Sequence, residues 1–158
     1  MAKYNIYGIG AAIVDTEVVV NDSFLNENEI SKGLMTLVDE GRQKYLIDSL
    51  TTQSIPVKRS CGGSACNSVV AASRFGSSAF FSGKVADDED GVFFVKDLKH
   101  SGVDFHQVDP SNGVTGKCLV MVTPDAERTM NTNLGASLEL SYREIDETAL
   151  ANSDWLYV

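Results

Sequence analysis

The stretch Gly62-Gly63-Ser64-Ala65-Cys66-Asn67 decides the fold, because its glycine pair leads straight into an alanine-rich segment. Beyond the glycines, apolar residues recur at helical spacing, as at Ala65 and Val69, and Gly76 is suited to a left-handed helix end. The pattern therefore predicts a helix over 65–75 that begins at a glycine pair.

Strand-like and helical stretches alternate along the rest of the chain. Apolar and β-branched runs predict strands at 6–10, 13–20, 78–85 and 154–158, the last one buried. Helical spacing predicts helices at 43–50 and 91–101, whereas residues 21–41 are predicted to be a loop and 56–60 a short extended segment. The order strand, helix, strand, helix favours an α/β fold with right-handed crossovers.

The last third of the chain contains a predicted β-hairpin. Residues 115–123 form its first strand, 124–127 its turn, and Arg128 begins the return strand. Ser141 and Glu144 then have the spacing of a capping box for a short helix. Because the chain ends on an apolar strand with no closing element, we expect an incomplete protein or one half of a split one.

Length and charge are those of an ordinary globular unit. A chain of 158 residues is long enough for a single core, and a domain of this size buries roughly 70% of its unfolded surface. The formal net charge of -9 opposes the basic surface that binds nucleic acid or anionic lipid. We therefore expect neither nucleic acid nor a membrane as a partner.

The first residues and the cysteines indicate a reducing location. Residues 1–5 lack the basic start, apolar stretch and cleavage site of a signal peptide, so a cytoplasmic location is expected. Cys61, Cys66 and Cys118 are odd in number and lack the spacing of metal ligands. This predicts three reduced thiols.

Features that often carry catalysis or metal binding have a plainer interpretation here. The acidic run 87–90 is more typical of a helix start or a solvated loop than of a metal site. Neither His100 nor His106 is placed to pair with a nucleophile, and both are interpreted as structural. The chain also lacks a phosphate-binding loop of the Gly-x-x-x-x-Gly-Lys-Ser/Thr type. No metal site is predicted.

The glycine pair is the first candidate binding site. Glycines at a helix N-terminus let a ligand approach the backbone, and the first N–H groups point at it with the positive end of the helix dipole behind them. One turn into the helix, Asn67 offers a donor and an acceptor, which suits a sugar hydroxyl. The alternative is that Gly62 and Gly63 form only a turn and that Asn67 is a helix-surface residue.

Asp15 is the second candidate. It lies in a strand-like run between apolar neighbours, where burying an acidic side chain costs free energy unless a partner binds it. A carboxylate can accept from two adjacent hydroxyls of a sugar. The alternative is that strand alternation points Asp15 to solvent together with Glu17.

Arg128 is the third candidate. It lies at the mouth of the predicted hairpin, where its planar guanidinium can hold a transferring phosphate. The alternative is a surface ion pair with Glu127 or Asp125, which is the commoner fate of a turn arginine.

Together these residues resemble a known family. The run 61–68, then Ala71-Ala72 and Gly76, and later the run 83–88 with Gly91, are similar to the N-terminal signature of ribokinase-type (PfkB family) carbohydrate and nucleoside kinases. The run 8–15 resembles the opening strand of that family, and 127–130 with 134–136 resembles its adenosine-kinase-like branch. The resemblance covers essentially the whole chain. It implies a ribokinase-like, Rossmann-type three-layer α/β sandwich with a small β-sheet lid.

The resemblance also implies roles and ligands. The acceptor hydroxyls would be held by Asp15, Gly62, Gly63 and Asn67. Arg128 would lie near the transferred phosphate, and strands near 12–20 and 116–131 would form a lid that excludes water. ATP and Mg²⁺ are the implied cofactors, a sugar or nucleoside is the implied partner, and the lid sheet can pair two subunits into a homodimer. One departure is Ala11, where members often carry a polar residue such as asparagine.

The larger departure is one of length. Members are much longer, and their second half supplies an Asp-Thr-x-Gly-Ala-Gly-Asp motif, with the catalytic base, that nothing in these residues resembles. The resemblance thus implies an ATP-dependent kinase acting on a sugar or nucleoside hydroxyl, with residues 1–158 as its N-terminal, acceptor-binding part and inactive alone. The alternatives are a sugar- or nucleoside-binding module without catalysis, and an incomplete fragment that needs a partner chain.

Overall fold

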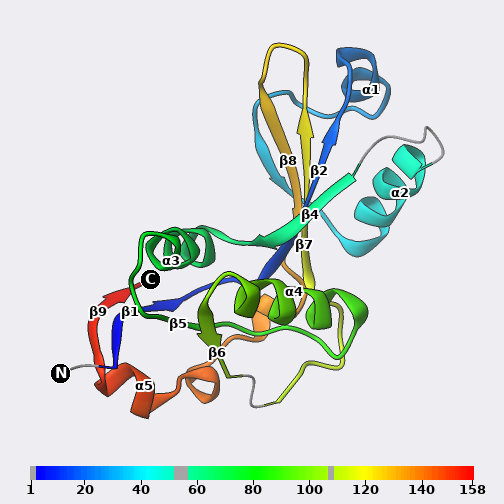
Figure 1. Ribbon diagram of the computed structural model, residues 1–158. Coiled ribbons are helices and arrows are strands. Elements are labelled where there is room, and N and C mark those ends of the chain that lie inside the picture. The colour runs from blue at the N-terminus through cyan, green and yellow to red at the C-terminus, as the bar shows by residue number, and fades with distance from the viewer. Residues whose placement is uncertain (1–2, 52–56, 107–108) are drawn as a thin grey trace. The chain divides into compact units, whose positions relative to one another are not determined.

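A computed structural model describes residues 3–51, 57–106 and 109–158 (Figure 1). The chain forms two compact units, each built from segments that are separate in sequence. The first unit contains Met1–Val14, Ser60–Gly116 and Leu134–Val158, and the second contains Asp15–Arg59 and Lys117–Asn133. Each unit has a β-sheet and a hydrophobic core of its own.

The first unit is built on a four-stranded parallel sheet with the strand order β6-β5-β1-β9. Its strands are β1 (Tyr4–Ile9), β5 (Ala79–Ser82), β6 (Val103–Phe105) and β9 (Ser153–Tyr157). Every residue of β5 is buried, as expected of a parallel strand that is covered on both faces. This parallel sheet confirms the predicted α/β class.

Helices lie on both faces of the parallel sheet. They are α3 (Ser64–Arg74), α4 (Glu89–His100) and the short α5 (Glu147–Ala151). Phe81 of β5 shares one hydrophobic cluster with Val69 of α3 and Phe94 of α4. Phe80 shares another with Ala149 of α5. Because consecutive strand residues point to opposite faces, the layers are helix, sheet and helix (Figure 1).

The acidic run 87–90 is a helix start, as predicted. Asp88 is the N-cap of α4, and its carboxylate accepts from the N–H of Gly91 at 2.7 Å. The same carboxylate accepts from the N–H and the hydroxyl of Thr115, at 2.9 and 2.6 Å. Asp88 therefore caps α4 and ties the chain before β7 to it.

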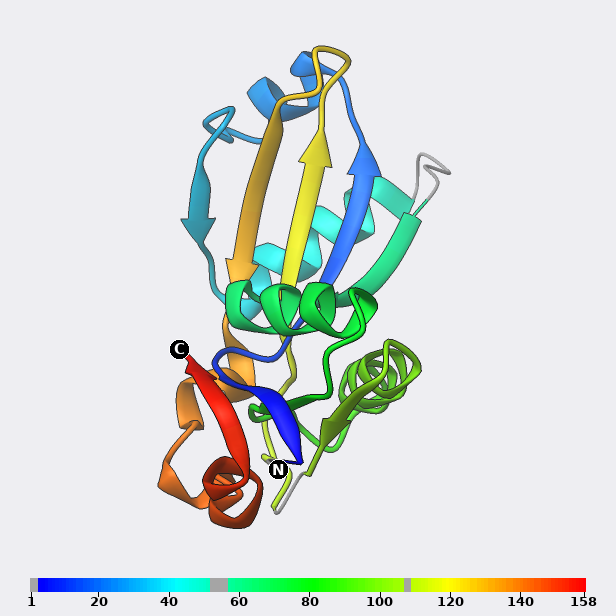
Figure 2. The same ribbon diagram turned by 60° about the vertical axis from the view of Figure 1, so that its left-hand side comes forward.

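The second unit is built on a five-stranded mixed sheet with the strand order β3-β8-β7-β2-β4. Its strands are β2 (Ile13–Val19), β3 (Met35–Leu37), β4 (Val57–Gly62), β7 (Gly116–Val122) and β8 (Arg128–Asn133). β7 and β8 form the predicted antiparallel hairpin, in which Val122 is opposite Arg128. Figure 2 shows these strands side by side, with α2 behind them.

Two helices, α1 (Asp22–Glu27) and α2 (Glu40–Thr51), accompany the mixed sheet. Leu25 of α1 and Leu46 of α2 belong to one buried cluster with Val18 and Leu119 of the sheet. The side chains of this cluster define the covered face of the mixed sheet. The opposite face, called the open face here, carries the alternate residues of the same strands.

Three elements of the structure, α1, β3 and α5, were not predicted because they are very short. Residues 21–41 were expected to form a loop, but they contain α1 and β3, of 6 and 3 residues. Asn21 caps α1 by accepting from the N–H of Phe24 at 2.9 Å. α5, of 5 residues, was likewise not predicted. Elements this short show less than two turns of periodicity, so their apolar residues give no pattern.

The strand predicted at 154–158 exists as β9, but the expectation that it is buried is wrong. It is an edge strand of the parallel sheet, and Trp155 and Val158 are 75% and 83% exposed. An apolar run alone does not distinguish a central strand from an edge strand. β9 therefore presents an uncovered apolar edge within the described residues.

Other predicted features are confirmed. Ser141 and Glu144 form a capping box at the 3₁₀ helix η2 (Tyr142–Glu144), which follows η1 (Gly135–Glu139). Gly76 has a φ of +96° just after α3. The three cysteines are buried and free.

Pro56, expected in the extended segment before β4, lies outside the described residues. Among the helices in the described ranges, none is long and apolar enough to cross a membrane.

Candidate functional site

Gly63 is the residue at which α3 begins. Its φ of +103° lies in a region that residues with side chains rarely adopt. A Cβ atom at this position would lie 2.2 Å from the carbonyl oxygen of Ala11, in the connection between β1 and β2. Both the backbone conformation and this close approach therefore require glycine.

The other two predicted residues of the glycine site lie on either side of Gly63, with Gly62 at the end of β4 and Asn67 in the first turn of α3. Because Gly63 has no side chain, no side-chain cap covers the start of α3. The N–H of Asn67 donates to the carbonyl of Gly63 at 2.8 Å, and the Asn67 side chain is exposed. Gly62, the last residue of β4, is buried. Backbone donors and an accessible amide thus lie together at the start of one helix, where hydroxyl or phosphate oxygens can bind.

Asp15 lies in β2 on the open face of the mixed sheet. Val18 belongs to the covered face, so alternation along the strand places Asp15 and Glu17 on the opposite one. Both acidic residues are half-buried rather than fully exposed. The interpretation that alternation simply points Asp15 to solvent therefore holds only in part.

Arg128 begins β8 on the same open face. Its Nη2 atom lies 3.1 Å from a carboxylate oxygen of Glu17, two strands away across β7. The ion pair expected with Glu127 or Asp125 is thus made with a residue 111 positions away. Asp125 instead binds Lys32, with 2.8 Å between the charged atoms. The guanidinium of Arg128 is anchored to β2 rather than to its own turn.

Cys118 is a further residue of the open face, which the sequence pattern identified only as a reduced thiol. Burial raises the pKa of its thiol to about 11, against the effect of a 3.2 Å hydrogen bond from the Thr132 hydroxyl. The charges of Asp15 and Arg128 act on the same thiol in opposite directions. Strand alternation could have revealed this neighbourhood, because Cys118 and Val122, the partner of Arg128, are on one face of β7.

The predicted residues are therefore brought together in two sets. Gly62, Gly63 and Asn67 lie in the first unit, and Asp15 and Arg128 lie in the second. No group of three or more His, Cys, Asp or Glu side chains within residues 3–51, 57–106 and 109–158 could hold a metal ion.

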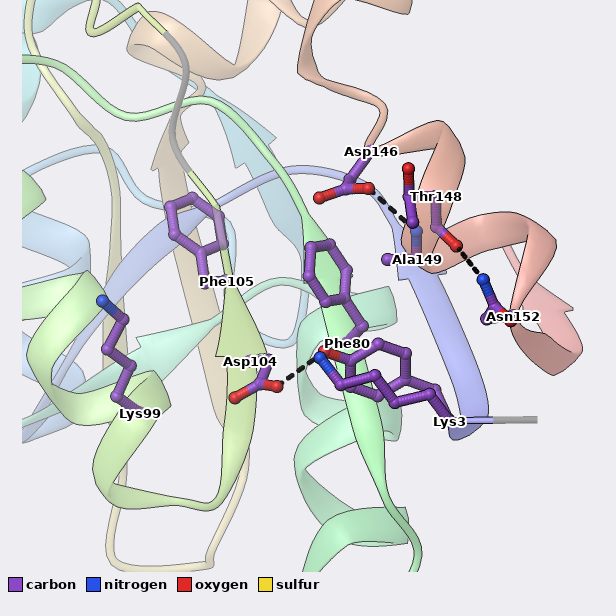
Figure 3. A pocket seen from close by; sticks show the side chains of 10 residues that line it. Lys3, Phe80, Lys99, Asp104, Phe105, Asp146, Thr148, Ala149 and Asn152 are labelled. Carbon is purple, nitrogen blue, oxygen red and sulfur yellow. Dashed lines mark hydrogen bonds between the residues drawn. The ribbon is translucent and has the colours of Figure 1, made fainter. Parts of the chain in front are cut away.

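A pocket of about 370 Å³ lies elsewhere in the first unit (Figure 3). Asp104 there accepts from the hydroxyl of Tyr4 at 2.7 Å, and Lys3 and Lys99 also line the pocket. Phe80 lines it as well, and Phe80 points to the sheet face that bears α5. The pocket contains none of the five predicted residues.

Solved structures of the same fold are known. The adenosine kinase from Sinorhizobium meliloti superposes with a TM-score of 0.86 and 38% sequence identity, over 99% of this chain and 47% of that one. A probable sugar kinase from Rhizobium etli CFN 42 gives a TM-score of 0.86 and 33% identity over the same shares. The ribokinase-like fold expected from the resemblance is confirmed, and the chain spans about half the length of these solved relatives.

Comparison with other protein sequences also finds relatives that are kinases. The 5-dehydro-2-deoxygluconokinase of Geobacillus kaustophilus is 34% identical over 101 residues, which are 61% of this chain and 30% of that protein. The model of the pfkB family carbohydrate kinases matches residues 39–158, which include the glycine pair, α3 and the whole β7–β8 hairpin. The chain therefore belongs to the pfkB family of carbohydrate kinases.

Proposed function

We propose that the protein containing this chain transfers the terminal phosphate of ATP, with Mg²⁺, to a hydroxyl group of a sugar or nucleoside. The observation that carries this proposal is the start of α3, where Gly63 is required as glycine and no side-chain cap covers the helix N-terminus. Membership of the pfkB family supports ATP as the phosphate donor. The contribution of this chain is to bind the acceptor.

In this proposal Gly62, Gly63 and Asn67 hold hydroxyl groups of the acceptor. The exposed amide of Asn67 can donate to one hydroxyl and accept from another. Gly63 has no side chain to cover the helix N-terminus, so a sugar ring can approach the backbone there closely. These contacts discriminate a polyhydroxylated ligand from an apolar one.

Asp15 and Arg128 are proposed to act from the mixed sheet. The half-buried Asp15 carboxylate accepts from acceptor hydroxyls, and Arg128 stabilises charge on the transferred phosphate. The mixed sheet, with its strands near 12–20 and 116–131, acts as a lid that excludes water from the phosphoryl group. Support comes from the open face, on which Asp15, Glu17 and Arg128 gather.

Phosphoryl transfer also needs a base to accept the hydroxyl proton, and we assign no residue of this chain to that role. The chain spans 47% of the length of its solved relatives. We propose that the base and the nucleotide site belong to a C-terminal part outside these 158 residues, which are the N-terminal part of a kinase domain and inactive alone.

The acceptor is tested with the whole protein that contains this chain. ATP and Mg²⁺ are supplied with ribose, fructose, adenosine or inosine, and phosphorylated product is measured. Similarity to the Sinorhizobium meliloti adenosine kinase favours a nucleoside, so turnover of adenosine or inosine is the expected result. If no acceptor in a broad sugar and nucleoside panel is phosphorylated, the proposed function is wrong.

Arg128 allows a sharper test of the same reaction. We expect R128A to lower kcat by at least about a hundredfold, because a charge that stabilises the transferred phosphate is lost. E17Q is the matched control, since it breaks the same ion pair and keeps the arginine. Equal loss in both variants would mean that the pair serves the fold and not the phosphate.

The uncovered edge of β9 favours a second candidate, a fragment that needs a partner chain. Trp155, Leu156 and Val158 are 75%, 54% and 83% exposed. Sedimentation of the 158-residue chain tests this idea, because a stable, folded monomer speaks against it.

A third candidate is a binding module without catalysis. Calorimetry with adenosine and ribose distinguishes it from a kinase, because the module binds ligand although the whole protein does not turn over ATP.

A homodimer through the mixed sheet is also proposed. Met35 and Leu37 of β3 are 56% and 59% exposed, and Val19 of β2 is 63% exposed. Exposed apolar residues on a sheet favour self-association. Replacing Leu37 with Asp should then convert a dimer into a monomer in sedimentation velocity, and a monomeric parent protein would rule the dimer out.

A further inference from the structure

Ser137 of η1 makes two hydrogen bonds to a single residue far away in sequence. Its hydroxyl accepts from the N–H of Ala12 at 3.0 Å and donates to the carbonyl of Ala12, also at 3.0 Å. Ala12 is fully buried and lies between the end of β1 and the start of β2. One side chain thus satisfies both backbone polar groups of this residue.

The Ser137 hydroxyl supplies Ala12 with the hydrogen bonds that a neighbouring strand supplies inside a sheet. Buried backbone N–H and C=O groups need partners, and within a sheet the adjacent strand supplies them. Ala12 belongs to neither β1 nor β2, and the hydroxyl of Ser137 takes the place of a neighbouring strand. Without that hydroxyl, both groups of Ala12 would lose this partner in a fully buried position.

The connection held by Ser137 forms part of the surroundings of Gly63. The carbonyl oxygen of Ala11 is the atom that a side chain at Gly63 would strike. A Cβ atom at Gly10 would lie 2.9 Å from the Cβ of Ala65, in the first turn of α3. The residues before Ala12 are therefore packed directly against the start of α3, and a shift of this connection would move atoms beside Gly63.

We propose that Ser137 is a positioning residue of the acceptor site. It fixes the Ala11–Ala12 connection, and thereby the backbone at Gly63 that binds the acceptor. The inference rests on the proposed function. Because Ser137 acts through Ala12 and touches no reacting group, its loss should weaken acceptor binding and leave the chemical step and the ATP site unchanged.

The test compares three variants of the whole protein with adenosine, or with the acceptor that the panel identifies. S137A should raise the acceptor KM about tenfold, with kcat and the KM for ATP changed less than about twofold. S137T keeps the hydroxyl and should behave like the parent. S73A is the matched control, because the Ser73 hydroxyl also binds a backbone carbonyl, that of Gly102, but at the far end of α3.

A second measurement keeps the inference testable without activity. Amide hydrogen exchange at Ala12 should accelerate at least about tenfold in S137A and stay slow in S73A. Unchanged acceptor KM or unchanged exchange at Ala12 in S137A overturns the inference while the kinase proposal stands. If S137A does not fold, S137C is measured in its place, with the same expectations. A parent protein that phosphorylates no acceptor refutes the proposed function itself, and the positioning role with it.

Discussion

The ammonium group of Lys84 lies 2.7 Å from a carboxylate oxygen of Glu144, and the two side chains are only 12% and 3% exposed. The other carboxylate oxygen accepts from the N–H and the hydroxyl of Ser141, each at 2.8 Å. Lys84 follows β5, whereas Glu144 belongs to the segment that leads to α5 and β9. This buried ion pair therefore ties the end of a central strand to the polypeptide that forms the sheet edge.

Removing one partner of the pair should be costly. K84M leaves a buried carboxylate without its cation, and we expect the free energy of unfolding to fall by about 3–5 kcal/mol. Urea denaturation measures this, and K84M/E144Q should recover most of the loss, because no buried charge stays unpaired and a glutamine amide oxygen can still accept from Ser141. K44A is the control, since Lys44 and Asp48 form an exposed pair at 2.8 Å that should contribute little to the free energy of unfolding. Equal losses in K84M and K44A would contradict the prediction.

The same carboxylate should make stability depend on pH. Burial raises the pKa of Glu144, but the hydrogen bonds from Lys84 and Ser141 lower it more, so that it lies below the ordinary 4.5. Well above pH 4.5 the carboxylate is ionised in both the folded and the unfolded chain, and its full contribution to stability is present. As the pH falls toward and below 4.5, the unfolded chain takes up the proton first and stability is lost.

We therefore expect the parent chain to lose more stability than E144Q between about pH 5 and pH 3 in urea titrations. Other carboxylates titrate equally in both proteins, so the difference between the two curves isolates Glu144. Parallel curves would show that this residue does not contribute.

Gly63 and Gly76 form a matched pair for testing the start of α3. Both have positive φ, +103° and +96°, but a Cβ atom would strike the Ala11 carbonyl only at Gly63 and would meet nothing within 4 Å at Gly76. G76A should therefore cost about 1–3 kcal/mol from backbone strain alone. G63A should cost at least about 2 kcal/mol more, because the close contact adds to the strain. Thermal denaturation of both variants measures the difference, and similar losses would mean that the contact relaxes freely.

Cys118 should be almost inert in the folded chain. Its thiol has a pKa of about 11, which leaves only about one thiol in a thousand ionised at pH 8. We expect iodoacetamide to label it at least about a hundredfold more slowly than free cysteine, as followed by mass spectrometry. In urea, the three cysteines of the chain should all react. Rapid labelling of Cys118 in the folded chain would contradict its burial.

The elements that sequence patterns predicted are those whose signal is repeated along the chain. α3 shows helical spacing over 11 residues between two glycines of positive φ, and the β7–β8 hairpin alternates over its length. β3 has only 3 residues, and it is a strand because Met35 pairs with Met130, almost a hundred positions away. No local pattern carries that information, because the partner decides the conformation.

The residues of the candidate site fall into the same two groups, those that a local sequence pattern identifies and those that it does not. Gly63 was identifiable, because a backbone that only glycine can adopt leaves a glycine in the sequence. The ion pair of Arg128 with Glu17 and the hydrogen bonds of Ser137 to Ala12 could not be identified from the sequence, since these partners are 111 and 125 positions apart. Such contacts follow from the strand order and from η1, which a single sequence does not reveal.

The edge strand β9 gives the chain an intrinsic optical reporter. Trp155 is the sole tryptophan of the sequence, and its side chain is 75% exposed at that edge. Its emission should resemble that of a solvated indole and be fully accessible to a collisional quencher such as iodide. Any polypeptide that pairs with β9 would shift the emission to the blue and shield it, so that the sheet edge can be titrated without a label.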